Sequence, residues 1–98
     1  MKPITVIATI KAKPKDIDFV KAQLCALIRP TRRERGCLQY RFYQDKDDPS
    51  LFNSYERWTA QRFIDKHLES THIKQYLKAT KNSVEVFEIR YFDQICKQ

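Results

Sequence analysis

The stretch that decides the fold runs from Gly36 to Trp58 and has the sequence GCLQYRFYQDKDDPSLFNSYERW. Two segments rich in aromatic residues, 37–44 and 51–58, flank a polar turn at 45–50 that contains aspartates, a proline and a serine. Aromatic residues favour strands, whereas Asp, Pro and Ser favour turns, so this stretch predicts a β-hairpin. Gly36 is the only glycine in the chain. We expect it to form a left-handed cap or turn before the hairpin, where a side chain would be penalised.

The residues before the hairpin predict one strand and one helix. Residues 4–12 are rich in β-branched side chains that alternate along the segment, which is typical of a strand, and Pro14 closes it. From Asp16 onward, apolar residues recur at steps of three and four, which indicates an amphipathic helix. We expect Pro30 to kink or end that helix.

The residues after the hairpin repeat this pattern in the opposite order. Thr59 can cap a helix, and Ser70 or Thr71 can start another turn of helix. Residues 84–95 are again extended. The predicted order is therefore β-α-β-β-α-β. This is the order of an α+β, ferredoxin-like fold, in which helices cover one face of a four-stranded antiparallel sheet.

The predicted strands carry apolar or aromatic side chains on both faces. Simple alternation places Tyr40 and Tyr43 on different faces of the sheet. It places Val84 and Val86 together on one face and Phe87 on the other. An apolar sheet face without helices marks an interaction surface. We therefore expect two copies of the chain to pack sheet to sheet as a homodimer.

Composition limits the class of protein. With 98 residues, 42% of them hydrophobic and 32% charged, the chain is expected to form one small globular domain. No signal-like segment is present, and no stretch approaches the roughly 18 apolar residues of a membrane span, so we expect a cytoplasmic protein without a membrane partner. Cys25, Cys37 and Cys96 are odd in number and form no CxxC pair. They predict reduced, partly buried thiols rather than disulfides or a zinc site.

The net charge of +7 raises the question of nucleic acid binding. The RNA recognition motif has the same order of elements, but its signature places aromatic residues after a basic-Gly pair on the third strand. Here Arg35 and Gly36 lead into the second predicted strand. Many of the lysines are scattered, which is typical of a solvated surface. We therefore expect no nucleic acid partner, and an RNA-binding module remains an alternative.

The chain has two histidines, His67 and His72. Histidine is the side chain whose ordinary pKa suits proton transfer near neutrality, so this pair is the first candidate for acid-base chemistry. Five residues on a continuous helix correspond to a rotation of roughly 140°, so the two rings would not share a site or chelate a metal. Only a break in the helix near Ser70 would bring them together. A structural role at such a break is the alternative for both histidines.

The second predicted strand of the hairpin carries further candidates. Asn53 and Tyr55 could donate hydrogen bonds to a substrate carbonyl or oxyanion, but alternation places them on the face opposite Glu56 and Trp58. Trp58 could stack on an aromatic ring, or it could belong to the core. For Glu56 we expect an ion pair with a neighbouring Arg or Lys.

Three short motifs occur in order along this chain: Gly36-Cys37-Leu38-x-Tyr40, Tyr55-Glu56-x-Trp58 and His67-x-x-Ser70-x-His72. Together they resemble the antibiotic biosynthesis monooxygenase (ABM) family, which includes quinol monooxygenases. The resemblance spans residues 4–95 and favours a single ABM-like domain over residues 1–98. Two features depart from the family pattern as we know it: Arg35 stands where a proline is expected, and the chain is unusually basic.

The resemblance implies a dimeric α+β barrel with a mostly apolar cavity between helices and sheet. Members of the ABM family oxidise quinol-like or polycyclic phenolic compounds with molecular oxygen and use no metal, flavin or other cofactor, and the resemblance implies the same for this chain. The chain has no glycine-rich dinucleotide fingerprint, which agrees with this expectation. In such a site we expect His67 to be the base that deprotonates the substrate, with His72 as the second choice. We expect Trp58 to stack on the substrate ring or to line the oxygen pocket.

Three alternatives remain: two related activities and one protein that only binds a ligand. Haem degradation by similar dimers uses an asparagine on the first strand, and residues 4–12 contain none. An isomerase acting on small phosphorylated sugars would suit the basic charge. A binding-only barrel would keep the dimer without the chemistry.

Overall fold

The computed structural model describes residues 2–96, and over this range it contains four strands and three α-helices. The strands are β1 (Ile4–Ala12), β2 (Cys37–Gln44), β3 (Leu51–Trp58) and β4 (Val84–Asp93). The helices are α1 (Ile17–Arg32), α2 (Gln61–Leu68) and α3 (Thr71–Thr80), and a short 3-10 turn, η1 (Pro14–Asp16), precedes α1. The predicted β-α-β-β-α-β order is confirmed, with the second helical segment divided into α2 and α3.

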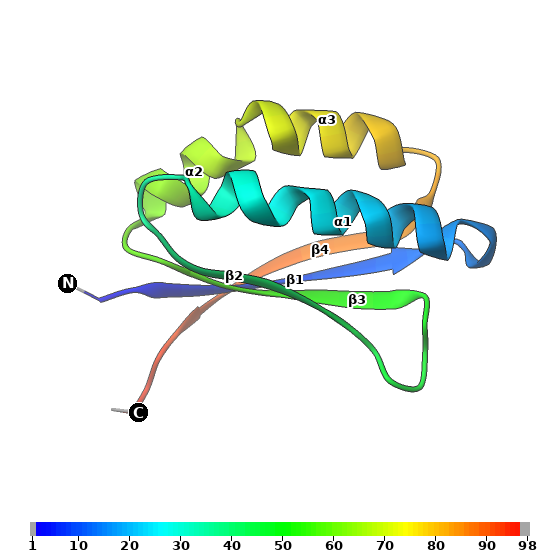
Figure 1. The fold of residues 1–98 in the computed structure, drawn as a ribbon. Coiled ribbons are helices and arrows are strands. Elements are labelled where there is room, and N and C mark those ends of the chain that lie inside the picture. Colours follow the sequence, from blue (N-terminus) through cyan, green and yellow to red (C-terminus); the bar gives the residue numbers. More distant parts are fainter. Residues whose placement is uncertain (1, 97–98) are drawn as a thin grey trace.

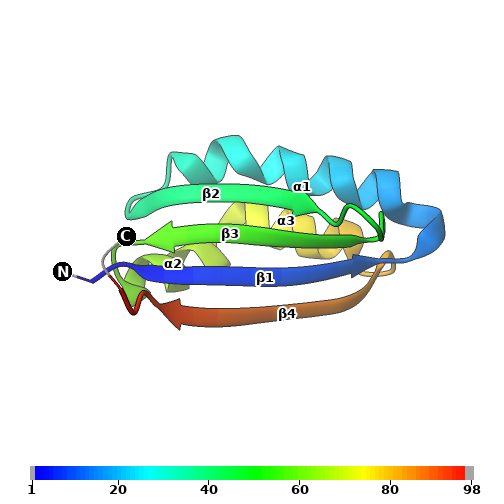
Figure 2. The same cartoon turned by 90° about the horizontal axis from the view of Figure 1, so that it is seen from below.

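All neighbouring strands are antiparallel, and their order in the sheet is β2-β3-β1-β4. The three helices lie on one face of this sheet, and within the described residues no helix covers the other face (Figures 1 and 2). The α+β, ferredoxin-like fold predicted from the sequence is therefore confirmed. Within residues 2–96, no helix is long and apolar enough to cross a membrane.

The core lies between the sheet and the three helices, and α1 contributes three of its side chains. Val20, Leu24 and Leu27 recur on one side of α1 and are buried against strand residues such as Val6 and Ile10. This is the amphipathic stripe that the spacing of three and four predicts. Burial of these side chains stabilises the fold by about 1.5–3 kcal/mol each.

Pro30 does not end α1, which was one of the two effects that we expected of it, because the helix continues to Arg32. The backbone N–H of Arg33 donates to the Pro30 carbonyl at 3.3 Å and closes the last turn. Proline lacks its own N–H and disturbs the turn before it, whereas residues after it can remain helical.

The prediction that Val84 and Val86 share a face is wrong. Lys11 pairs with Val86 while Ala12 pairs with Val84, so the register shifts between Lys11 and Ala12 and leaves Glu85 as an extra residue. Such a β-bulge reverses the alternation of side chains. Val84 consequently packs against the core.

The ends of the short helices differ in how they are capped. Thr59 does not cap α2: the N-cap residue is Ala60, with no side-chain hydrogen bond. The N–H of Thr59 instead donates to the Gly36 carbonyl at 2.9 Å, which keeps Thr59 at the end of the hairpin. Ser70 does cap α3, as predicted, because its side chain accepts a hydrogen bond from the Ile73 N–H.

Gly36 has a φ of +84°, which confirms its predicted left-handed conformation. A Cβ atom at this position would also overlap the ring of Phe63.

We expect Gly36→Ala to lower the free energy of unfolding by about 2–4 kcal/mol, because backbone strain and overpacking add. Urea denaturation measures this loss. In a Phe63→Ala background the same substitution should cost less, because the ring contacts are gone and only the contact with the Cβ of residue 63, at 2.7 Å, remains beside the backbone strain. A loss near zero in the wild-type background would contradict both causes.

Candidate active site

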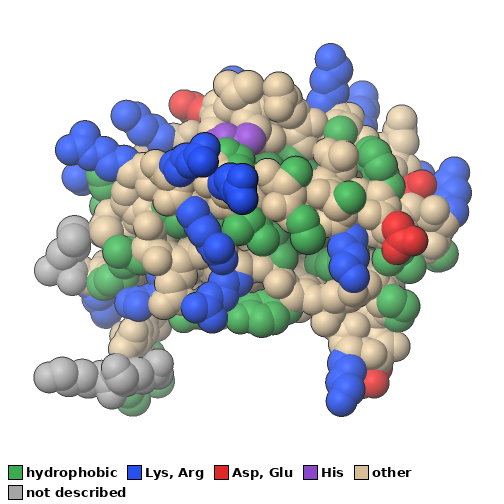
Figure 3. All heavy atoms as spheres, viewed as in Figure 1, with side chains coloured by type: hydrophobic (Ala, Val, Ile, Leu, Met, Phe, Trp, Pro, Cys, Tyr) green, Lys and Arg blue, Asp and Glu red, His purple; other side chains and the backbone are tan. Residues whose placement is uncertain are grey.

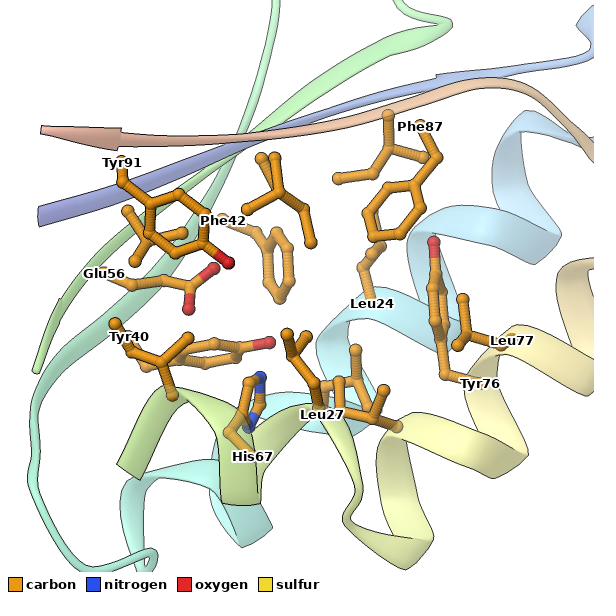
Figure 4. Close-up of a pocket in the computed structure, with 17 residues that line it drawn as sticks. Leu24, Leu27, Tyr40, Phe42, Glu56, His67, Tyr76, Leu77, Phe87 and Tyr91 are labelled. Carbon is orange, nitrogen blue, oxygen red and sulfur yellow. The ribbon is translucent and has the colours of Figure 1, made fainter. Parts of the chain in front are cut away.

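A cavity of about 140 Å³ lies between the sheet and the helices. Figure 4 shows the 17 residues that line it, which come from the sheet and from all three helices. Fifteen of them are aliphatic or aromatic, and the other two are Glu56 and His67. The cavity is therefore a mostly apolar chamber whose wall also holds three tyrosine hydroxyls, one carboxyl and one imidazole. Figure 4 shows Glu56 and His67 near its α2 end, together with Tyr40 and Tyr91.

The cavity reaches the surface beside β4. Phe87 and Tyr91 line it but are 47% and 48% exposed, and Leu77 on α3 is 43% exposed. The opposite wall is closed, since Val6, Ile10 and Tyr40 are almost completely buried. A ligand would enter between β4 and the helices.

Glu56 is 6% exposed, and its carboxyl group is held by two hydrogen bonds. Ser54 Oγ donates to Oε2 at 2.7 Å, and Trp58 Nε1 donates to Oε1 at 3.0 Å. The Ala8 N–H in turn donates to Ser54 Oγ at 2.8 Å, which fixes the serine. The expected ion pair with Arg or Lys is wrong, because alternation turns Glu56 toward the helices and the neighbouring Arg57 toward the open sheet face.

Burial raises the pKa of Glu56, and the hydrogen bonds from Ser54 and Trp58 offset this only in part. The charged form of a carboxyl is disfavoured where water is excluded. Glu56 therefore keeps its proton to higher pH than an exposed glutamate. In its neutral form it can donate a hydrogen bond as well as accept one.

Because the pKa of Glu56 is higher in the folded chain, its contribution to stability is complete below the unfolded value near 4.5 and is lost as the pH rises through the folded pKa. We expect the free energy of unfolding of wild type, measured relative to Glu56→Gln, to fall as the pH rises above that unfolded value. Urea denaturation at a series of pH values gives this difference. Glu85→Gln removes an exposed carboxylate and serves as the matched control. Parallel curves for wild type and Glu56→Gln would contradict the expectation.

The two histidines meet at one carboxylate oxygen. Nδ1 of His67 lies 2.6 Å from Oε2 of Glu34, and Nε2 of His72 lies 2.7 Å from the same atom. The helix break required for this is present, since α2 ends at Leu68 and α3 begins at Thr71. A continuous helix would separate the two rings, but this break brings them together, as the sequence required.

The contact with the Glu34 carboxylate fixes which ring nitrogen of His67 carries the hydrogen and which one has a lone pair. A carboxylate accepts hydrogen bonds, so Nδ1 of His67 carries the hydrogen that it donates to Glu34. The neutral ring then has its lone pair on Nε2, at the other end of a ring that lines the cavity. Edge contact with Tyr40 and a tilted contact with Trp58, at centroid distances of 5.3 and 4.9 Å, hold the ring in place.

The other predicted site residues do not line this cavity. Trp58 is completely buried behind it, where it contacts His67 and donates to Glu56. His72 lies on the far side of Glu34 and is partly exposed. Asn53 and Tyr55 line a shallow depression on the open sheet face, where Asn53 Oδ1 accepts from Thr9 Oγ1 at 2.9 Å. The structure thus brings His67 to the cavity, with Trp58 in support.

All three cysteines are free thiols, as predicted. Cys25 and Cys96 are exposed, so the expectation of partial burial is wrong for both and correct for Cys37. Burial, with the nearby charges of Glu34 and Glu56, raises the pKa of the Cys37 thiol to about 11. A protonated thiol is a poor nucleophile, so Cys37 is unsuited to covalent catalysis near neutral pH.

The fold and the cavity define a class of ferredoxin-like α+β proteins with a mostly apolar chamber between the sheet and the helices. The family model described as "Antibiotic biosynthesis monooxygenase" matches residues 3–79. The chain therefore belongs to this family.

Similar proteins come from several bacteria. Rv0793 of Mycobacterium tuberculosis, named as a candidate monooxygenase, is 35% identical over 74 residues, which are 76% of this chain and 72% of that protein. The uncharacterised protein sll1783 of Synechocystis is 30% identical over 76 residues, which cover 78% of this chain but only 52% of that protein. The crystal structure of PA3566 from Pseudomonas aeruginosa superposes with a TM-score of 0.94 at 30% identity, over 98% of this chain and 97% of that one.

Proposed function

We propose that this protein is a cofactor-independent monooxygenase that oxidises quinol-like or phenolic aromatic compounds with molecular oxygen in the cavity. One observation carries the proposal: the chamber is mostly apolar, apart from three tyrosine hydroxyls, and its wall holds Glu56 and His67, whose acid-base groups are fixed by hydrogen bonds from behind. An electron-rich aromatic ring suits such walls, and a fixed base suits a phenolic hydroxyl. Membership of the ABM family supports the same class of reaction.

The size of the cavity favours a small substrate. Its volume of about 140 Å³ is close to that of an engineered cavity, about 150 Å³, that binds benzene. A single-ring hydroquinone therefore fits the chamber as it stands. A polycyclic phenol would extend through the opening between Phe87 and Tyr91 and the helices.

The first chemical step is removal of the phenolic proton by Nε2 of His67. The resulting phenolate is electron-rich enough to pass one electron to dioxygen, and the radical pair can combine at the ring carbon beside the phenolate oxygen. The hydroperoxide so formed loses water, which leaves one oxygen atom on the ring as a carbonyl. For a hydroquinone the balance is hydroquinone plus O₂ to hydroxyquinone plus H₂O. No external reductant is required.

Glu56 and the apolar walls assist these steps in different ways. As a neutral acid, Glu56 can donate a hydrogen bond to the substrate or to the departing peroxide oxygen. Glu34 provides a counter-charge when His67 becomes protonated. The aliphatic and aromatic lining excludes water, which would otherwise solvate and protonate the superoxide and the peroxide.

The open sheet face supports a homodimer. Tyr43, Val86 and Phe92 on this face are 54%, 39% and 43% exposed. Apolar side chains grouped on a face without helices are typical of an interface, and a second copy of the chain is its natural partner in this fold class. Sedimentation at micromolar concentration should give the mass of two chains, and Phe92→Glu should shift it toward one.

Oxygen uptake tests the proposed reaction. Chelator-treated protein would be incubated in air-saturated buffer with a single-ring hydroquinone, a naphthoquinol and a three-ring phenol. We expect uptake well above autoxidation, and fastest with the substrate that the cavity encloses. Glu85→Gln, which changes an exposed residue that does not line the cavity, should match wild type. No uptake with any compound would refute the proposal and favour a binding-only protein.

A further inference from the structure

We propose that Glu34, His67 and His72 form a binding site for a divalent transition metal ion of the zinc class, and that its occupation switches off the base in the cavity. Each residue offers one ligand atom, and these atoms lie within 4.8 Å of one another. Among residues 2–96 this is the one group of at least three potential ligands so arranged. Binding of the metal stands on this geometry alone, whereas the inhibitory effect rests on the proposed function.

The elements that carry the three ligands are fixed relative to one another before any ion arrives. Glu34 lies in the turn after α1, His67 in the last turn of α2 and His72 in the first turn of α3. Ser70 fixes the break between the two helices, since its hydroxyl donates to the His67 carbonyl at 2.7 Å and accepts from the Ile73 N–H at 3.4 Å. A site built on fixed elements loses less entropy when a ligand binds.

The Glu34 carboxylate is free of stronger partners. The ion pairs found in the described part of the chain join Glu34 only to the two histidines, although Arg33 and Arg35 are its neighbours in sequence. The two arginines are exposed. An arriving cation therefore displaces hydrogen bonds to imidazole and does not have to break an arginine–carboxylate pair.

The donor set selects the metal. Two imidazole nitrogens and one carboxylate oxygen suit Zn²⁺, Co²⁺, Ni²⁺ and Cu²⁺, whereas Mg²⁺ and Ca²⁺ prefer oxygen ligands. Ligands at 2.0–2.1 Å around a tetrahedral zinc are separated by about 3.3 Å, so Glu34 Oε2 must withdraw by about 0.6 Å from its present 2.6 and 2.7 Å contacts. The two histidine nitrogens, which lie within 4.8 Å of each other, must come to the same separation, which small rotations of the two rings provide. A glutamate side chain in a turn, 17% exposed, can make that shift.

Solvent can reach the cluster. The His72 side chain is 22% exposed. Figure 3 shows histidine atoms at the molecular surface among the helices. An ion can therefore enter from outside without passing through the cavity, and water can fill the remaining coordination position.

Metal binding would change the tautomer of His67. In the free protein Nδ1 carries the hydrogen and Nε2 is the base that faces the cavity. A metal on Nδ1 takes that lone pair, so the neutral ring must carry its hydrogen on Nε2. The base then becomes a donor and can no longer accept the phenolic proton. Because the ion sits on the side of the ring away from the cavity, we assign it this inhibitory role and no redox role.

Tag-free protein, treated with chelator and dialysed, would be titrated with Co²⁺ and with Zn²⁺. We expect visible d–d absorption with Co²⁺, its displacement by Zn²⁺, and a rise in Tm of at least about 5 °C at a hundredfold excess of Zn²⁺ over its Kd. His72→Gln, which alters a partly exposed ligand, should weaken Zn²⁺ binding at least tenfold. Glu69→Gln removes a neighbouring exposed carboxylate and should bind as wild type does.

No visible Co²⁺ absorption and no Tm shift with Zn²⁺ would overturn the site. Equal loss of binding in Glu69→Gln would also overturn it, since the ion would then lie elsewhere. If Zn²⁺ binds and oxygen uptake is measurable, inhibition should follow occupancy, and full activity of the zinc-bound protein would refute the inhibitory role. Zinc binding without any oxygen uptake would count against the proposed function and leave the metal site established.

Discussion

His67→Gln should lower kcat for oxygen uptake by about 10²–10⁴-fold, which is the usual contribution of a positioned general base. Glutamine retains polarity and approximate size but has no basic nitrogen to face the cavity. The apolar walls remain, so KM should change far less than kcat. Steady-state oxygen uptake on a single-ring hydroquinone measures both quantities. A variant with kcat within threefold of wild type would contradict the role of His67.

Two controls separate loss of the base from general damage. His72→Gln makes the same chemical change outside the cavity lining and should cost less than His67→Gln. The deficit of His67→Gln should also shrink as the pH approaches the pKa of the phenol, near 10 for a simple phenol such as tyrosine, because solvent then supplies the phenolate. A deficit that is independent of pH would indicate structural damage.

Trp58→Ala should lower the free energy of unfolding by about 3–5 kcal/mol, the range for deleting a large aromatic side chain from a core. Trp58 is completely buried, contacts the His67 ring and donates to the Glu56 carboxyl. Its removal leaves a void and takes one of two hydrogen bonds from a buried acid. Urea denaturation monitored by circular dichroism measures the loss, and a value below about 1.5 kcal/mol would contradict the assigned packing.

Trp58→Phe tests the hydrogen bond apart from the volume. The phenyl ring fills most of the space but has no Nε1–H, so we expect a smaller loss of about 1–3 kcal/mol. The pKa of Glu56 should rise further, because the bond from Trp58 lowers it in the wild-type protein. The stability difference between Trp58→Phe and wild type should therefore grow as the pH rises above the ordinary carboxyl range. A constant difference would show that this bond does not act on Glu56.

Local patterns were sufficient to predict the elements of the fold. Alternation identified the strands and correctly separated Asn53 and Tyr55 from Glu56 and Trp58, because the side-chain period of two is fixed by the backbone. The capping preference of Ser70 indicated where the second helix divides. Alternation failed at Val84, where a bulge adds one residue and nothing in the local sequence marks it.

The site itself depends on contacts between distant segments. Glu34 lies 33 residues from His67 in the chain and within a run of arginines, so nothing in its local sequence linked it to the histidines. Only the packing of the α1 end against α2 and α3 shows that its carboxylate joins both histidines. Glu56 was visible in the Tyr55-Glu56-x-Trp58 motif, but its burial beside Ser54 and Trp58 follows from the assembled sheet.

Incorporation of ¹⁸O tests most directly the claim that the cavity is a monooxygenase site. Chelator-treated protein would be incubated with a hydroquinone under ¹⁸O₂ and quenched early, and the product would be analysed by mass spectrometry. We predict a hydroxyquinone with one ¹⁸O atom, formed by wild type and reduced with His67→Gln in proportion to kcat. An unlabelled product, or none above autoxidation, would contradict the account.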